Sequence, residues 1–186
     1  MTDSNVIRGV KIPTRCLGLP RLSNGMPIPK FASWKNGVAD LTTMNAEYAR
    51  HAMQFKTCWI CGQKLGRHCA FVGGPKSAHA GVYSDFPMHR ECAEFAVQVC
   101  PFIVYGSNYR KNPTLNTDDM ARMVDNDNPV IFCVSVASRY RYEPSAGVFV
   151  IHPDEQLWFL HGKPATPEQI ADAKNKAQAE IESQKT

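Results

Sequence analysis

Two short motifs, Cys58-Trp59-Ile60-Cys61-Gly62 and His89-Arg90-Glu91-Cys92, decide how this chain folds. A C-x-x-C-G sequence forms a tight turn whose backbone NH groups point at the two sulfurs, and the glycine relieves the turn. A His-x-x-Cys pair places both side chains on one face of the first turn of a helix. Three thiolates and one imidazole form a closed tetrahedral ligand set that suits structural zinc. The spacing therefore predicts one structural Zn²⁺ ion per chain, held by these three cysteines and this histidine.

The 27 residues between Cys61 and His89 are long enough for a hairpin that returns the start of the helix to the turn. A strand is expected over 68–72 and ends at Gly73-Gly74-Pro75. A loop follows over 77–81, and 82–83 form a short return strand. The helix is expected over 88–99, with Pro87 near its start, where a missing NH costs nothing. Turn, hairpin and ligand-bearing helix together are the layout of a treble-clef zinc module.

The stretch also resembles a family of uncharacterised bacterial and phage zinc-binding proteins with a treble-clef-like core. The similarity covers roughly residues 20–105 and is weaker over 130–170. It implies a zinc-binding fold without an established activity. The pair His68-Cys69 departs from the family pattern, which leaves open whether a fifth ligand competes for the metal. The segments that carry the resemblance are Gly25–Pro29, Cys58–Gly66, Ala70–Pro75, Pro87–Ala93 and Cys100–Phe102.

Length and composition point to a single globular domain, 1–186, with a real core. The apolar content of 44%, the charged content of 20% and the net charge of +4 are ordinary, and they permit anionic partners without requiring them. No apolar leader follows Met1, and the longest apolar run, Val130–Ala137, is too short to cross a bilayer. Seven cysteines without an export signal favour reduced thiols in a cytoplasm, that of a bacterial host if the protein is phage-encoded.

The expected fold class is α+β: a treble-clef-like zinc module packed with a small antiparallel β-meander and a C-terminal helix. Cys16 is expected as a small buried core residue rather than a fifth ligand, and Cys133 as an inert core residue within a strand. The regions expected within the domain are an extended N-terminal strap (1–30), the zinc-binding core (31–105), a polar surface excursion (106–128) and the meander with its helix (129–186).

Local signals place several elements. Asn36-Gly37 between two apolar runs predicts a β-hairpin, because both turn positions favour positive φ. A helix is expected over 44–55, with Asp40 or Thr43 as its N-cap.

In the last third, three apolar segments predict the antiparallel meander, and they span residues 130–136, 147–151 and 156–160. The final helix has Thr166 as N-cap, Pro167 at its first position and Gln169 completing a capping box.

Two stretches interleave basic and aromatic residues, Tyr109-Arg110-Lys111 and Arg139-Tyr140-Arg141-Tyr142. Aromatic rings stack on bases while arginines meet phosphates, so both are candidate nucleic-acid contacts. The alternatives are a loop whose tyrosines cover the edge of the core, and anchors for a protein partner, since Tyr and Arg are enriched at interfaces.

The sequence favours a non-enzymatic, zinc-stapled binding protein, because four protein ligands leave a catalytic metal no open position. No dinucleotide, Walker or Gly-x-Ser-x-Gly motif is present. The expected partner is a macromolecule, protein or nucleic acid, and neither a membrane nor a small-molecule cofactor is expected. The alternative is an HNH-like treble-clef nuclease, for which His68, His79 and Asp85 are the local candidates.

Overall fold

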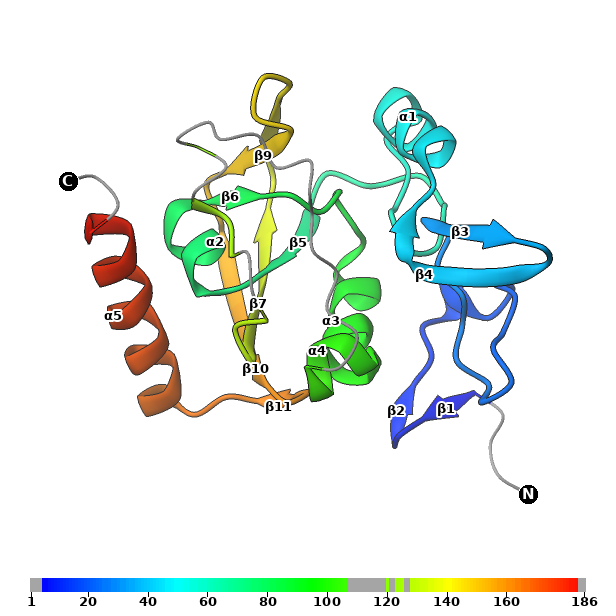
Figure 1. The fold of residues 1–186 in the computed structure, drawn as a ribbon, viewed down its shortest axis with the longest axis horizontal. Coiled ribbons are helices and arrows are strands. Elements are labelled where there is room, and N and C mark those ends of the chain that lie inside the picture. The colour runs from blue at the N-terminus through cyan, green and yellow to red at the C-terminus, as the bar shows by residue number, and fades with distance from the viewer. Residues whose placement is uncertain (1–4, 107–119, 121–122, 126–127, 184–186) are drawn as a thin grey trace.

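The computed structural model describes residues 5–106, 120, 123–125 and 128–183. Figure 1 shows a central antiparallel sheet, with the N-terminal elements at one end of the molecule and the C-terminal helix at the other. The strands are β1 (Val6–Ile7), β2 (Val10–Lys11), β3 (Ala32–Lys35), β4 (Val38–Met44), β5 (Cys69–Gly73), β6 (Val82–Tyr83), β7 (Ile131–Ala137), β8 (Tyr140–Glu143), β9 (Val148–Ile151), β10 (Glu155–Leu160) and β11 (Lys163–Pro164). The helices are α1 (Ala46–Phe55), α2 (Pro75–Ala80), α3 (Arg90–Val99), α4 (Pro101–Tyr105) and α5 (Pro167–Ser183).

The largest sheet has the strand order β11-β10-β7-β5, and all its pairs are antiparallel. Every residue of β7 is buried, as expected for its run of β-branched and apolar side chains. Successive side chains of a strand point to opposite faces of the sheet. Phe132 and Val134 accordingly lie in the main core, whereas Ile131 and Cys133 lie in a smaller core.

Helices cover both faces of this sheet. Helix α3 packs against β5 and β7, while α2 packs against β7 and α5 (Figure 1). The smaller core joins Ala78 of α2 to Trp158 of β10, and Ile170 and Ala173 of α5 pack against it. Cys133 is therefore a buried core residue, as predicted.

A second sheet has the order β6-β9-β8, and it corrects two predictions about strand pairing. Strands β5 and β6 do not form a hairpin, because β5 pairs with β7 and β6 pairs with β9. The three-stranded meander is also wrong, since β9 pairs with β8 rather than with β10. Strand β8 was not expected. It forms a hairpin with β9 and so occupies an edge of β9 at which the predicted meander would have placed another strand.

The predicted loop over 77–81 is also wrong, because α2 occupies most of it. Pro75 stands at the first helical position, and Gly81 ends the helix with φ +70°. The side chain of Asp125 accepts hydrogen bonds from the backbone NH groups of Lys76 (3.3 Å) and Ser77 (3.1 Å). These two amides at the start of α2, which have no partner within the helix, thus donate to a residue nearly 50 positions away, which a local capping rule does not find.

Two local predictions are confirmed. Asn36 and Gly37 have φ of 50° and 78°, and they join β3 to β4. At the start of α5 the capping box is formed: the Thr166 NH donates to Gln169 Oε1 (2.9 Å) and the Gln169 NH donates to Thr166 Oγ1 (3.3 Å).

The predicted cap of the first helix is wrong. Asn45 caps α1, and its Oδ1 accepts a hydrogen bond from the Tyr48 NH at 3.0 Å. The carboxylate of Asp40 is occupied within β4, where it accepts from the hydroxyls of Thr42 (2.6 Å) and Thr43 (2.8 Å). These bonds hold the pKa of Asp40 well below its usual range.

The N-terminal segment folds back on itself instead of forming one extended strap. Strands β1 and β2 make a hairpin, a single 3₁₀ turn follows at Thr14–Cys16, and a bridge joins Arg21 to Pro27. Its apolar residues Ile12 and Met26 reach the main core. Within the described part of the chain, no helix combines the length and the apolar character needed to cross a membrane.

Candidate metal centre

The structure brings the four predicted ligands together. The donor atoms of Cys58, Cys61, His89 and Cys92 all lie within 4.8 Å of one another, and all four residues are buried. The Sγ of Cys61 lies 3.3 Å from Nδ1 of His89. Two side chains come from the turn after α1, and two come from the start of α3, so the group joins parts of the chain about 30 residues apart in sequence.

The turn that carries the cysteine pair, residues 58–62, is closed by backbone hydrogen bonds. The Cys58 NH donates to the Gln63 carbonyl (2.8 Å), and the Gly62 NH donates to the Cys58 carbonyl (2.9 Å). Gly62 has φ +79°, and a Cβ at this position would lie 2.9 Å from Cγ of Lys30. The positive φ favours glycine here, and the covering Lys30 side chain would have to shift to admit a Cβ.

His89 is oriented by hydrogen bonds outside the ligand group. Its Nε2 lies 3.0 Å from the carbonyl of Lys64, which can only accept, so Nε2 carries the proton and Nδ1 faces Cys61 with its lone pair free. A ligating histidine is commonly held in this way through its second ring nitrogen. His89 also precedes α3 as its N-cap, and its backbone NH points at Cys58 Sγ (3.4 Å).

The segment that leads into α3 is held by backbone hydrogen bonds of the kind found between antiparallel strands. Ala70 and Met88 exchange both of their backbone hydrogen bonds, at 2.8 and 2.9 Å. The Trp59 NH donates to the carbonyl of Pro87 at 3.2 Å. The two ligand pairs are thus linked through backbone bonds as well as through the ligand group itself.

The three thiols influence one another's ionisation. Hydrogen bonds donated by Cys61 and Cys92 lower the pKa of Cys58 to about 2, whereas donating to Cys58 raises the pKa of Cys61 to about 11. Hydrogen bonds to its neighbours, Cys16 first, raise the pKa of Cys92. A bound cation would favour the ionised form of all three ligand sulfurs. Three sulfurs and one imidazole nitrogen fit a soft or borderline metal ion, so the group can hold a metal.

A fifth cysteine lies beside the centre, but outside the four-residue group. Cys16 is fully buried, as predicted, and its Sγ lies 3.8 Å from that of Cys92. Sequence reasoning could not foresee this contact, because 76 residues separate the two positions. His68 is exposed, and the buried Cys69 directs its Sγ to the carbonyl of Gly66 (3.7 Å). Among the described residues, neither His68 nor Cys69 belongs to the ligand group.

Of the two stretches that interleave basic and aromatic residues, the structure describes only the second. Tyr109, Arg110 and Lys111 lie outside the described residues. Arg139 and Arg141 are exposed, and Arg141 pairs with Glu143 at 3.1 Å.

The tyrosines of the second stretch lie in strand β8, not in a loop. Tyr140 packs edge-on against Phe71, with ring centroids 5.5 Å apart, and burial raises its pKa. Tyr142 packs against Phe149 at 5.0 Å. Both rings therefore cover the core edge, which was the alternative interpretation of this stretch.

Among the described residues, no metal-ligand cluster forms around the histidines of the nuclease alternative. His68 and His79 are both exposed, and among the described residues neither joins a cluster of three or more metal-ligand side chains. Comparisons of the chain with protein-family models, curated proteins and solved structures give no match.

Proposed function

We propose that this protein is a non-enzymatic binding protein whose fold is stapled by one structural zinc ion, and that its partner is another macromolecule. The observation that carries the proposal is the closed and buried group of Cys58, Cys61, His89 and Cys92. Zinc accepts three thiolates and one imidazole in a tetrahedral site, and this set is typical of structural rather than catalytic zinc. The ion would supply charge neutralisation and a cross-link between the two ligand pairs.

Two features favour a structural over a catalytic metal. Four protein donors complete a tetrahedral site and leave no position for a water molecule or a substrate. Both ring nitrogens of His89 are engaged, one toward the ligand group and one with the Lys64 carbonyl, so this histidine has no free nitrogen for proton transfer.

The treble-clef interpretation belongs to the same proposal. Its support is the order of a cysteine turn, strand β5 and a helix start that presents His89 and Cys92. In the arrangement we propose, β5 pairs near the metal site with a single residue instead of a separate return strand. This residue is Met88, which forms an antiparallel bridge with Ala70 of β5.

A binding role is supported by apolar surface on the metal-bearing half. Trp34 is 51% exposed, Val38 is 69% exposed and Phe55 is 47% exposed. Exposed apolar side chains of this size are available for contact with a partner.

Affinity capture from an extract of the native cell tests the binding role. Tagged wild-type protein should retain a protein or a nucleic acid that the same protein carrying Cys61→Ser does not retain, because the contact surface depends on the metal-supported fold. Treating the extract with nuclease distinguishes the two classes of partner. Equal material on both columns would contradict the proposal.

A cleavage assay tests the nuclease alternative. Purified protein incubated with single- and double-stranded DNA and RNA, with Mg²⁺ or Mn²⁺, should leave all of them intact, because the ligand group is closed and the nearby histidines are isolated. Cleavage that disappears in His68→Ala or His79→Ala, but not in His152→Ala as a matched exposed histidine, would favour the HNH-like enzyme instead.

A further inference from the structure

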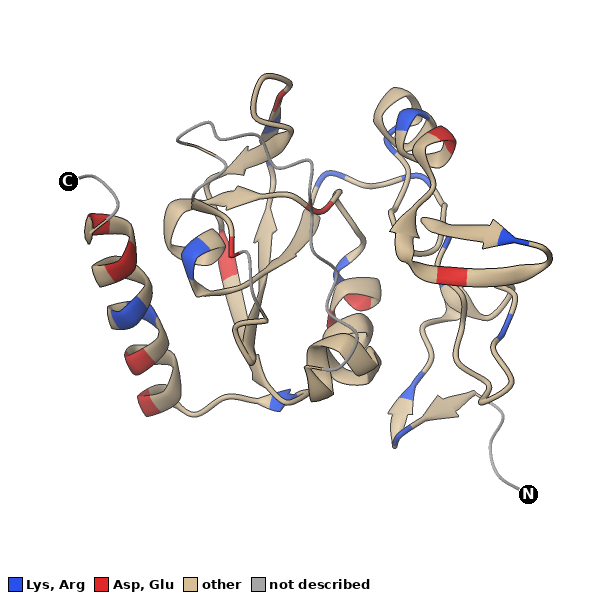
Figure 2. Cartoon of the chain, viewed as in Figure 1, with Lys and Arg blue, Asp and Glu red and all other residues tan. Residues whose placement is uncertain are grey.

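Charge is divided unevenly along the chain. Residues 1–68 contain ten Lys and Arg against three Asp and Glu, whereas residues 69–186 contain eleven against fourteen. Figure 2 shows the result in space: blue predominates over the N-terminal elements, and red and blue mix over α5 and the rest. The modest net charge of the whole protein thus conceals a strongly basic half.

Most of these cations are not neutralised. In the basic half, Arg15 pairs with Glu91 (2.7 Å) and Lys35 pairs with Asp40 (3.5 Å). The described residues provide no ion pair for a further set of exposed side chains: Lys11, Lys30, Arg50, Lys56, Lys64 and Arg67.

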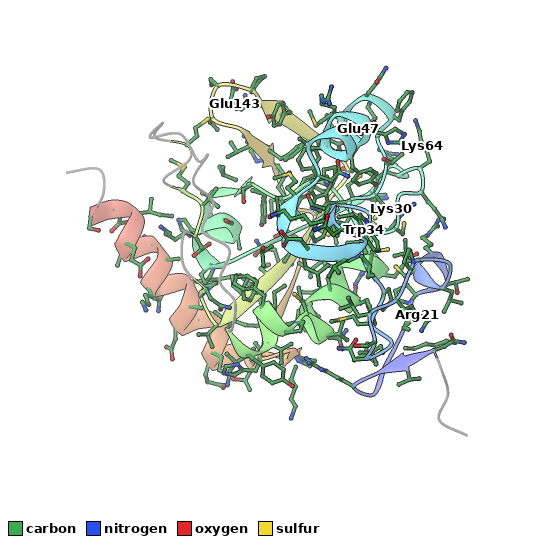
Figure 3. The ribbon with its side chains drawn as sticks, turned by 45° about the vertical axis from the view of Figure 1, so that its right-hand side comes forward. Arg21, Lys30, Trp34, Glu47, Lys64 and Glu143 are labelled. Atoms are coloured by element: carbon green, nitrogen blue, oxygen red, sulfur yellow. The ribbon has the colours of Figure 1, made fainter. Side chains whose placement is uncertain are left out.

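Part of this set forms a band over the metal-binding turn. The backbone NH of Lys30 donates to the Ile60 carbonyl (2.9 Å), and the stem of Lys30 covers Gly62. Lys64 follows in the same turn, and its Nζ donates to the carbonyl of Phe55 (2.8 Å). Figure 3 labels Lys64, Lys30 and Trp34 in the same part of the view, with Glu47 near them. We call Lys30, Trp34, Phe55, Lys56 and Lys64 the knuckle band.

Phe55, one of the two aromatic members of the knuckle band, is exposed but is supported by other rings. Phe55 packs against His51 with ring centroids 4.7 Å apart, and His51 stacks on Tyr48 at 5.8 Å. Tyr48 stacks in turn on the buried Trp59 at 5.5 Å. A row of rings therefore runs from the core out to Phe55. Glu47 lies at the opposite end of α1 from Phe55, so it does not neutralise this end of the helix.

We propose that the knuckle band binds single-stranded nucleic acid, with phosphates at Lys30, Lys56 and Lys64 and unpaired bases stacked on Trp34 and Phe55. The proposal rests on the proposed function and names its partner. Exposed cations together with exposed aromatic side chains fit a chain that offers phosphates and free base faces together. A duplex hides its base faces, and an acidic protein segment offers charge without planar rings, so each matches only half of the band.

Binding of labelled oligonucleotides of about 20 nucleotides tests this, since single-strand sites span roughly 4–16 nucleotides. Wild-type protein should bind an oligothymidylate and an oligouridylate more tightly than a duplex, and affinity should fall as salt rises. The double variant Lys30→Gln, Lys64→Gln keeps the side-chain stems and should reduce the log–log salt slope by about 1.4, because each lost phosphate contact removes about 0.7. Trp34→Ala should weaken binding on the order of tenfold, and Trp34→Phe should restore most of it.

The matched control is Lys163→Gln, Lys176→Gln, which removes two exposed cations from the other half of the protein and should leave binding unchanged. Thermal unfolding and metal content verify that each variant is folded. The inference is overturned if wild type does not bind at low salt, if polyglutamate competes as well as the oligonucleotide, or if the two double variants bind equally. Failure to bind oligonucleotide together with continued capture of a protein would overturn this inference alone. Failure of both would overturn the proposed function as well.

Discussion

Cys61→Ser should release the metal ion and unfold the part of the chain that surrounds it. A hydroxyl is a poor replacement for a thiolate, and three remaining donors leave the ion exposed to water. Structural zinc contributes on the order of 10 kcal/mol of apparent binding free energy, which small modules convert into folding free energy. Elemental analysis should return about one equivalent of zinc per chain for wild type and little for the variant. Circular dichroism should show lost structure in the variant and in chelator-treated wild type.

Cys16→Ser is the matched control for this prediction. Cys16 is as buried as the ligands, and its sulfur lies 3.8 Å from Cys92, yet it lies outside the ligand group. This variant should keep its equivalent of metal. A folded Cys61→Ser protein without metal would contradict the structural role of the ion, and loss of metal from Cys16→Ser would enlarge the ligand set.

Features encoded by neighbouring residues were predictable from the sequence. The cysteine turn, the Asn36-Gly37 hairpin and the capping box at Thr166 each depend on a few consecutive side chains, and each forms as expected. The meeting of the turn with His89 and Cys92 was also foreseen, because closed metal sites place strong chemical demands on the spacing of their ligands.

Strand pairing was not predictable in the same way. Strands β5, β7, β9 and β10 were all recognised as apolar segments, but their pattern of side chains does not state which edges meet. The same holds for contacts made across long separations, such as Asp125 at the start of α2 and Cys16 beside the metal centre. The strand β8 was missed because Tyr140 and Tyr142 alternate with arginines, a pattern that suits a half-buried edge strand as well as a basic loop.

The knuckle band could be recognised only in the three-dimensional structure. Its lysines are scattered over 30–64, and no short window of sequence is strongly basic there. The fold collects them because the chain before β3 lies against the cysteine turn through the Lys30–Ile60 hydrogen bond. The same turn therefore carries two of the metal ligands on its inner side and supports cations on its outer side. Loss of the metal should consequently weaken the nucleic-acid binding proposed for the knuckle band as well as stability.

Trp59→Ala should destabilise the protein by about 3–5 kcal/mol, the usual cost of removing a large buried aromatic side chain. Trp59 is 2% exposed and lies between the two cysteines of the turn. Its ring stacks on Phe86 at 4.3 Å, on Phe31 at 5.3 Å and on Tyr48 at 5.5 Å. Alanine would leave a cavity bordered by all three rings, next to the metal ligands. Chemical denaturation of the metal-loaded protein measures the loss of unfolding free energy.

Trp34→Ala provides the comparison, because it removes the same side chain from an exposed position of β3 in the same half of the protein. Its effect on unfolding should stay within about 0.5 kcal/mol, as is usual for surface substitutions. Trp59→Ala should also lose its metal to a chelator faster than wild type, since the turn that holds Cys58 and Cys61 would no longer be fixed by its central ring. Equal destabilisation by the two substitutions would show that the aromatic stack does not support the metal centre. Unchanged chelator kinetics in Trp59→Ala would show that the turn keeps its shape without the ring.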